Sequence, residues 1–167
     1  MSYHRTVLEV PDSLVNWENE KHRFCINLII SKGEDLYSVL QQKLQDHLPL
    51  KVRLEHRTRK SIILTRAAER PFGGERVDQP AAGYDGRGDG FSSEGATLTD
   101  LGQYLEDFDI LNAPVINETG LTGYYKIDFS FDPENPSSRK TALEQLGLTY
   151  TVEEREIEVM IIHQPAR

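Results

Sequence analysis

The sequence contains one cysteine, Cys25, and no long apolar run. A single cysteine cannot form an internal disulfide or supply a multi-cysteine metal site, so it does not identify a redox compartment. No stretch approaches the roughly 18 apolar residues of a membrane-spanning helix, and residues 1–5 lack the apolar run of a secretory signal peptide. We therefore expect no membrane insertion by this segment, and either a cytosolic chain or an excised or processed piece of a larger protein.

Basic residues are fewer than acidic ones. The 167 residues include 19 Lys and Arg against 27 Asp and Glu, which gives a net charge of -8. Affinity for nucleic acid comes mainly from basic groups that meet phosphates, so this composition disfavours a nucleic-acid partner. The apolar fraction of 38% is enough to close a core in a chain of this length. The composition predicts one ordinary domain or two small domains in close association.

One pattern occurs three times: a short amphipathic helix, an alternating strand, a polar turn and a second strand. Its clearest copies are residues 35–66 and 137–163, and a looser copy is 97–131. Charged turns at 57–60 and 153–156 are too short for a parallel crossover, so they predict antiparallel pairing. The sequence therefore predicts an α+β fold in which small helices pack on mostly antiparallel sheets and helix-strand-strand units repeat.

Individual elements rest on periodicity and on capping residues. Leucines four apart predict a helix from Asp35 to Leu48, and the capping-box spacing of Thr97 and Asp100 predicts a second helix. Two N-terminal strands are expected at 5–10 and 23–30. The most regular alternation of apolar and polar residues predicts a further strand that contains Tyr125, Ile127, Phe129 and Phe131.

Residues 70–95 differ in composition from the rest of the chain. They hold seven of the twelve glycines and almost no large aliphatic residue. Such a segment has little apolar surface to offset its ordering entropy, so we interpret it as a flexible linker or long loop. It would separate a first α+β half, 1–69, from a second, 96–167, unless the chain forms one compact domain overall.

Constellations of catalytic or metal-binding residues are weak. The five histidines show no metal-ligand spacing such as H-x-x-x-H. On a strand, His22 and Cys25 would point to opposite faces, which disfavours an activated thiolate. Residues 85–90 contain Arg-Gly-Asp but lack the carboxylate spacing of a calcium loop, so a solvated loop is the preferred interpretation. The sequence predicts no catalytic, cofactor-binding or metal-binding residues and no enzyme; the alternative is a small thiol-dependent or hydrolytic enzyme with a dispersed site.

Residues 51–70 carry a local excess of positive charge, although the chain as a whole is acidic. Residues 51–70 include seven basic residues against Glu55 and Glu69. A solvated sheet face is one interpretation of this excess, and docking of the acidic second half or of a second protomer is another. The functional interpretation is recognition of an acidic peptide or an anionic envelope polymer. The candidate partner-binding residues are Arg53, Arg57, Arg59 and Lys60.

Three strings carry a resemblance to a known family: residues 114–125 (PVINETGLTGYY), 142–148 (ALEQLGL) and 158–163 (EVMIIH). They resemble the soil-associated bacterial domain family of unknown function, and residues 36–64 are similar to its upstream half. That family occurs alone after signal peptides, or at the ends of antirepressor-type membrane peptidases and periplasmic thioredoxin-like proteins. Asn117 departs from the usual Asp, and the Asp that typically lies between the last Ile and His is absent here.

The stretch 142–162 also looks like the short module at the N-termini of secretins and TonB-dependent receptors. Both resemblances imply a periplasmic or otherwise extracytoplasmic module that binds a protein or ligand and is part of a larger envelope protein, and they carry over no catalytic residues. They imply a protein or peptide partner, such as a fused thioredoxin-like domain or an envelope component.

Overall fold

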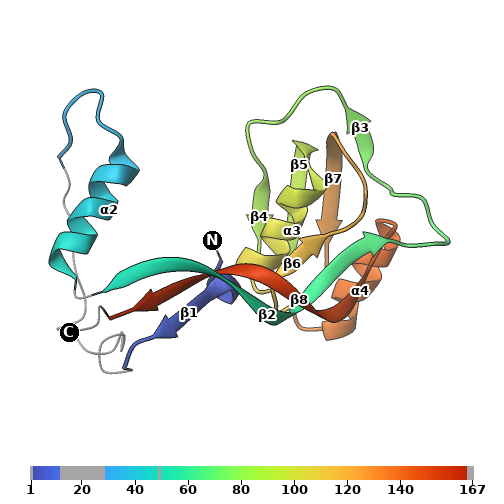
Figure 1. Ribbon diagram of the computed structural model, residues 1–167. Coiled ribbons are helices and arrows are strands. Elements are labelled where there is room, and N and C mark those ends of the chain that lie inside the picture. Colours follow the sequence, from blue (N-terminus) through green and yellow to red (C-terminus); the bar gives the residue numbers. More distant parts are fainter. Residues whose placement is uncertain (1, 12–28, 49, 165–167) are drawn as a thin grey trace. The chain divides into compact units, whose positions relative to one another are not determined.

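The computed structural model describes residues 2–11, 29–48 and 50–164 (Figure 1). By its internal contacts the chain divides into two compact units. The first is formed within Arg5–His56 and Glu158–Arg167, and the second by Ser2–His4 and Arg57–Ile157. These boundaries differ from the halves 1–69 and 96–167 expected from composition, because Glu158–Arg167 group with Arg5–His56, whereas Ser2–His4 and residues 57–69 group with the second unit. Within the described residues, no helix is long and apolar enough to cross a membrane.

An antiparallel sheet lies wholly in the second unit. Its strands are β3 (Glu75–Val77), β4 (Asp85–Arg87), β5 (Gly90–Ala96) and β7 (Tyr124–Ser130), in the order β3-β7-β5-β4. The strand expected from the alternation of Tyr125, Ile127 and Phe129 is confirmed as β7, because these three side chains are buried while the residues between them are exposed.

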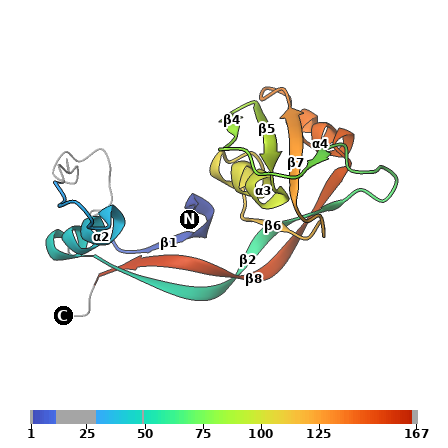
Figure 2. The same ribbon diagram turned by 90° about the horizontal axis from the view of Figure 1, so that it is seen from above.

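Two helices cover this sheet. The chain forms α3 (Leu98–Asp107) where the capping-box spacing predicts a helix, with Thr97 Oγ1 accepting from Asp100 N at 3.1 Å and Asp100 Oδ2 accepting from Thr97 N at 2.8 Å. The next helix, α4 (Pro136–Gln145), begins after Asn135, whose side chain accepts from Ser137 N. Helix α3 contacts β5 and β6 (Val115–Asn117), and α4 contacts β7, as Figure 2 shows from above.

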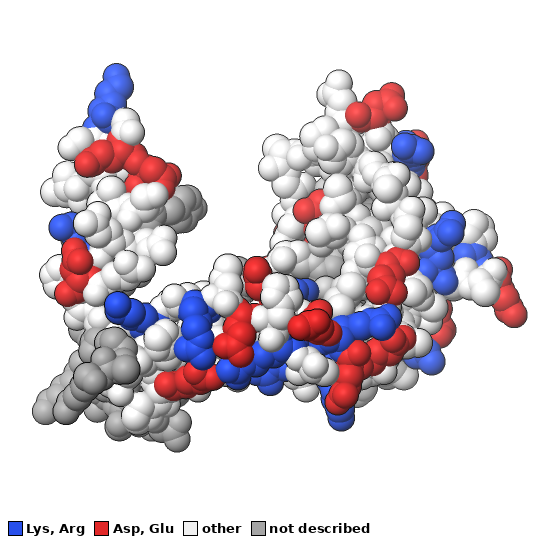
Figure 3. All heavy atoms as spheres, in the orientation of Figure 1, with Lys and Arg blue, Asp and Glu red and all other residues white. Residues whose placement is uncertain are grey.

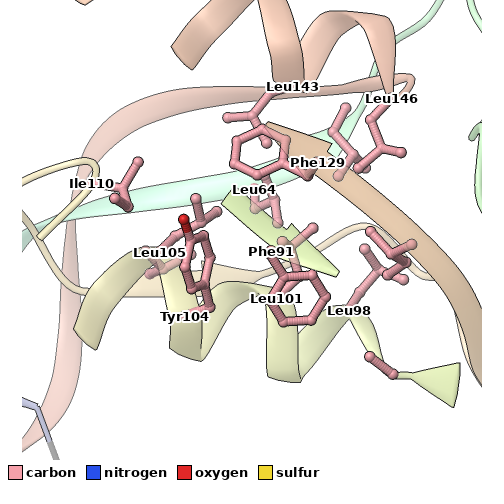
Figure 4. Packing of buried hydrophobic residues seen from close by; sticks show 14 of the residues in the cluster. Leu64, Phe91, Leu98, Leu101, Tyr104, Leu105, Ile110, Phe129, Leu143 and Leu146 are labelled. Atoms are coloured by element: carbon pink, nitrogen blue, oxygen red, sulfur yellow. The ribbon is translucent and has the colours of Figure 1, made fainter. Parts of the chain in front are cut away.

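The core of the second unit lies between these helices and the strands. Figure 4 shows Leu101, Tyr104 and Leu105 of α3 pointing toward Phe129 and Leu64. The rings of Tyr104 and Phe91 pack at a tilt of 53° with their centroids 5.3 Å apart, and the Tyr104 hydroxyl donates a hydrogen bond to Arg87 O at 2.7 Å. Burial of apolar surface on this scale is the main stabilising term of the unit.

The other sheet has the order β1-β8-β2-β6, with β1 (Thr6–Glu9), β8 (Leu148–His163) and β2 (Lys51–Arg66). Strand β1 pairs in parallel with the end of β8, and β6 pairs in parallel with residues 62–64 of β2. The class of the fold is therefore α+β, as the sequence predicts.

The turns expected at 57–60 and 153–156 are wrong, because β2 and β8 are each one continuous strand of 16 residues. Neither segment contains the Gly, Pro, Asn or Asp that turns prefer, and the apolar-polar alternation passes into an alternation of charged residues without a break. Basic β2 lies beside acidic β8, and opposite charges on neighbouring strands favour pairing. The two clearest copies of the repeat are thus a helix followed by one long strand.

In the first unit, α2 (Leu36–His47) begins after Asp35, whose side chain accepts from Ser38 N at 2.8 Å. This confirms the helix expected from the leucine spacing. The strand expected at 5–10 is present as β1. Most of the strand expected at 23–30, including Cys25, lies outside the described residues.

The structure of residues 70–95 differs from the expected linker, because they contain β3, β4 and most of β5. Phe91 is 1% exposed. The glycines have packing reasons: a Cβ at Gly90 would lie 2.9 Å from Phe129 O, and one at Gly95 would lie 2.6 Å from Ala81 N. Glycine content here reflects close approach of backbones, which composition alone does not distinguish from chain flexibility.

Candidate functional site

The structure places all four predicted partner-binding residues on β2. Arg53 belongs to the first unit, whereas Arg57, Arg59 and Lys60 belong to the second. The sequence interpretation placed Arg57 and Arg59 on a turn; they lie within the strand instead. The two groups are therefore considered separately.

Arg53 is paired within its own unit. Its Nη2 lies 2.8 Å from Glu9 Oε2 and its Nε lies 3.3 Å from Glu55 Oε2. The hydrogen bond to Glu9 is the largest cause that raises the pKa of Arg53, and the bond to Glu55 adds to it. With two carboxylates in contact, Arg53 has less charge to offer to another molecule.

Arg59 and Lys60 contrast with Arg53. Lys60 is exposed and Arg59 is half-buried. In the described part of the chain, Arg59 Nε is buried without a hydrogen-bond partner, and neither residue forms an ion pair with a carboxylate. A guanidinium that has lost part of its hydration without gaining an acceptor is unfavourable, and an acceptor that reaches its accessible terminal nitrogens would offset part of this cost.

No described strand pairs with the outer edge of β2 beside these cations. Ile62 N donates to Pro114 O at 2.8 Å, and Leu64 O accepts from Glu118 N at 2.9 Å, so even-numbered residues direct their backbone groups toward β6. Pairing with β6 covers only residues 62–64. By alternation, the N–H and C=O groups of Thr58 and Lys60 point to the same edge, where no strand of the described residues pairs with them.

Acidic residues of β8 balance only part of this charge. Within the second unit, β2 contributes four basic residues and no acid, while β8 contributes three glutamates and Arg155. Arg155 Nη2 lies 3.0 Å from Glu153 and 3.6 Å from Glu118. Figure 3 shows basic and acidic side chains interleaved along these strands. Positive charge therefore remains in excess, and it lies on β2, the strand whose outer edge no described strand covers.

The histidines and Cys25 were the other candidates. Among described residues there is no group of three or more His, Cys, Asp or Glu that could hold a metal ion. His4 Nε2 lies 2.9 Å from Asp109 Oδ1, which gives His4 a partner within the second unit. His22 and Cys25 lie outside the described residues.

The Arg-Gly-Asp string forms the tip of a hairpin. Arg87 pairs with Gly90 across the turn that joins β4 to β5, and its Nη2 lies 3.0 Å from Asp85 Oδ2. Arg87 and Asp89 are exposed. The segment is therefore a short solvated hairpin and not the irregular loop that the glycines indicate.

The string TGLTG, part of the family resemblance, follows β6 and has a structural explanation. Asn117 Oδ1 accepts from Thr119 N at 3.1 Å and from Thr119 Oγ1 at 2.7 Å, and Thr119 Oγ1 accepts from Leu121 N at 3.2 Å. Gly120 and Gly123 have φ values of 68° and 95°, which favour glycine. These residues hold a tight turn beside the start of α3, where a pocket of about 410 Å³ opens.

Glu106 is a buried charged residue that sequence reasoning missed. It is 3% exposed, accepts from Val115 N at 2.9 Å and accepts a hydrogen bond from the Ser2 hydroxyl. Its position in the last turn of α3 places an acid where the helix dipole disfavours it. No pattern distinguishes it from an exposed helical glutamate; its role is to hold the first residue of β6 and the N-terminal segment.

A family model described as "Protein of unknown function (DUF3738)" matches residues 16–164. The chain belongs to this family. The DUF3738 match covers both the β2 edge and the TGLTG turn. No curated protein and no solved structure matches the chain.

Proposed function

We propose that this DUF3738 protein is a non-catalytic interaction module that acts outside the cytoplasm and binds an extended segment of a protein partner along the open edge of β2 at residues 57–61. The observation that carries the proposal is the unpaired edge itself. Thr58 and Lys60 present two N–H and two C=O groups toward a side that no described strand occupies. An extended peptide that adds a strand there would satisfy all four groups.

The neighbouring structure supports strand addition at this place. Strand β6 pairs in parallel with β2 from Ile62 to Leu64. An incoming segment would pair with the same edge of β2 at the residues just before those that β6 covers. The edge is anchored at one end, since Ile62, Ile63 and Leu64, which follow it in β2, are each no more than 3% exposed. A rigid edge loses little conformational entropy on binding, which favours affinity.

The extracytoplasmic location and the kind of partner rest on the family resemblance. It suggests an envelope component, or a thioredoxin-like domain fused to this one, as the protein that supplies the segment. The short module of secretins and TonB-dependent receptors suggests the same setting.

Proline substitution tests the proposal. The probes are fluorescein-labelled extended peptides that alternate threonine and valine, and binding is measured by fluorescence anisotropy. Thr58→Pro removes an edge N–H without removing a bond to β8, so it should abolish binding, while Thr58→Val keeps the N–H and should bind as the wild type does. Failure of the wild-type protein to bind any such peptide, or equal binding by Thr58→Pro, would contradict the proposal.

A further inference from the structure

We infer that the segment bound at this edge is acidic, with two consecutive carboxylate residues that meet Arg59 and Lys60. This inference rests on the proposed strand addition and names the chemistry of its occupant. It starts from the difference between two arginines on one strand: Arg53 has two carboxylates in contact, and Arg59 has none in the described part of the chain.

Strand geometry requires the two acids to be consecutive. Arg59 and Lys60 are neighbours in β2, so their side chains project from opposite faces of the sheet. Two consecutive residues of an added strand also project from opposite faces, and directly opposed side chains have Cβ atoms about 4.5–5.5 Å apart. An Asp or Glu pair would therefore place one carboxylate beside each cation.

Burial makes the interaction on one face the more specific. Arg59 is half-buried and its Nε is inaccessible to water and unpaired within the described residues. A carboxylate that approaches along the edge can accept from the remaining guanidinium donors and compensate for the lost hydration. Lys60 is exposed, so its contribution should be weaker and more easily screened by salt.

A second copy of the chain is not the occupant favoured by these charges. If two β2 edges paired around a twofold axis, basic residues of one copy would oppose basic residues of the other, and like charges across a strand pair are destabilising. Positive charge on an edge is a known means of preventing self-association. The same charge admits an acidic heterologous segment.

Three labelled peptides test the inference on the intact protein. They share one alternating threonine and valine scaffold and differ only at two central residues, which are Glu-Glu, Gln-Gln or Lys-Lys. We expect the Glu-Glu peptide to bind about tenfold more tightly than the Gln-Gln peptide at low salt. The ratio of the affinities for the Glu-Glu and Gln-Gln peptides should decrease when the salt concentration is raised from about 0.05 M to about 0.5 M. The Lys-Lys peptide should bind most weakly.

Charge reversal provides the matched control. The double variant Arg59→Glu/Lys60→Glu should invert the order and prefer the Lys-Lys peptide. Arg66→Glu reverses one charge elsewhere on β2, which matches the single change in Lys60→Glu, and it should keep the wild-type order. Circular dichroism and the thermal midpoint verify that each variant folds. If the double variant does not fold, Lys60→Glu alone replaces it, because Lys60 is exposed. This single variant should reduce the preference for the Glu-Glu peptide.

The outcomes separate this inference from the proposed function. Equal affinity for all three peptides, with loss of binding in Thr58→Pro, would overturn the acidic occupant and leave strand addition intact. Absence of binding by every peptide would overturn both. Salt-sensitive self-association that Arg59→Glu/Lys60→Glu abolishes would show a second copy on the edge and would overturn the heterologous occupant.

Discussion

The two sheets end in different ways. In the antiparallel sheet the outer strands β3 and β4 have three residues each, and at β4 the side chain of Arg87 folds onto Asp85. In the other sheet, β2 runs for 16 residues and β6 covers only three of them. Short, charge-neutralised edges offer little for another chain to pair with, whereas a long edge that no described strand covers is a template for strand addition. This difference supports the proposal that a partner segment adds to β2 and not to β3 or β4.

The largest expected effect concerns the buried sheet. Phe129 of β7 is 3% exposed, and Phe129→Ala should lower the free energy of unfolding by about 3–5 kcal/mol through lost burial and the remaining cavity. Val152 of β8 is 59% exposed, and Val152→Ala should change it by less than about 0.5 kcal/mol. Urea denaturation measures both. Similar losses for the two variants would mean that β8 is buried against something beyond the described contacts.

The next effect tests which backbone groups of β2 are free. Arg59→Pro removes an N–H that alternation directs toward β8, so the free energy of unfolding should be roughly 2–3 kcal/mol lower than in the wild type. Lys60→Pro removes an N–H directed to the edge that no described strand covers, so it should lower the free energy of unfolding by only about 1 kcal/mol or less. The two variants are compared by urea denaturation. The reverse order of stability would place β8 on the other side of these residues.

A third effect concerns the short strand that closes the edge beyond residue 61. Glu106→Ala leaves the Val115 N–H without its buried acceptor, so stability should fall by about 1–3 kcal/mol. Asp107→Ala, one residue further along α3 and exposed, should change stability by less than about 0.5 kcal/mol. Amide exchange of Leu64 should accelerate in Glu106→Ala alone; unchanged exchange would show that β6 is held by other contacts.

A fourth effect appears only in alkali and concerns the protected edge at β4. Burial, with a smaller contribution from Asp89, raises the pKa of Tyr104 to about 12, above the roughly 10 of an unfolded tyrosine. The neutral hydroxyl is thus favoured in the fold. Its contribution to stability should be complete below about pH 10 and should be lost as the pH rises through 12. Ultraviolet titration should show a late ionisation near pH 12 that is absent in Tyr104→Phe; a titration curve that Tyr104→Phe leaves unchanged at this pH would contradict the assignment.

Particular residues show how much of the fold the sequence could predict. The start of α3 follows from Thr97 and Asp100 and the burial of β7 follows from strict alternation, because both signals are local. Continuous β2 and β8 escaped prediction because runs of charged residues resemble turns when the neighbouring strand is unknown. The glycines at 90 and 95 resemble a linker until the backbones that they contact are seen.

The candidate site was predicted only in part. The sequence identified Arg53, Arg57, Arg59 and Lys60 as a basic cluster, but not the pairing of Arg53 with Glu9, which lies 44 positions away. It also could not show that no described strand pairs with the outer edge of the backbone beside Arg59 and Lys60. Both properties depend on which strands become neighbours, and a single sequence does not specify strand order.

Residue-resolved amide exchange tests the central claim most directly. In the free protein, the amides of Thr58 and Lys60 should exchange much faster than those of Arg57 and Arg59, because only the latter are directed toward β8. Addition of the Glu-Glu peptide should slow Thr58 and Lys60 and leave Arg57 and Arg59 unchanged. Equal protection of all four amides in the free protein, or no change at Thr58 and Lys60 with the peptide bound, would contradict an open edge that binds by strand addition.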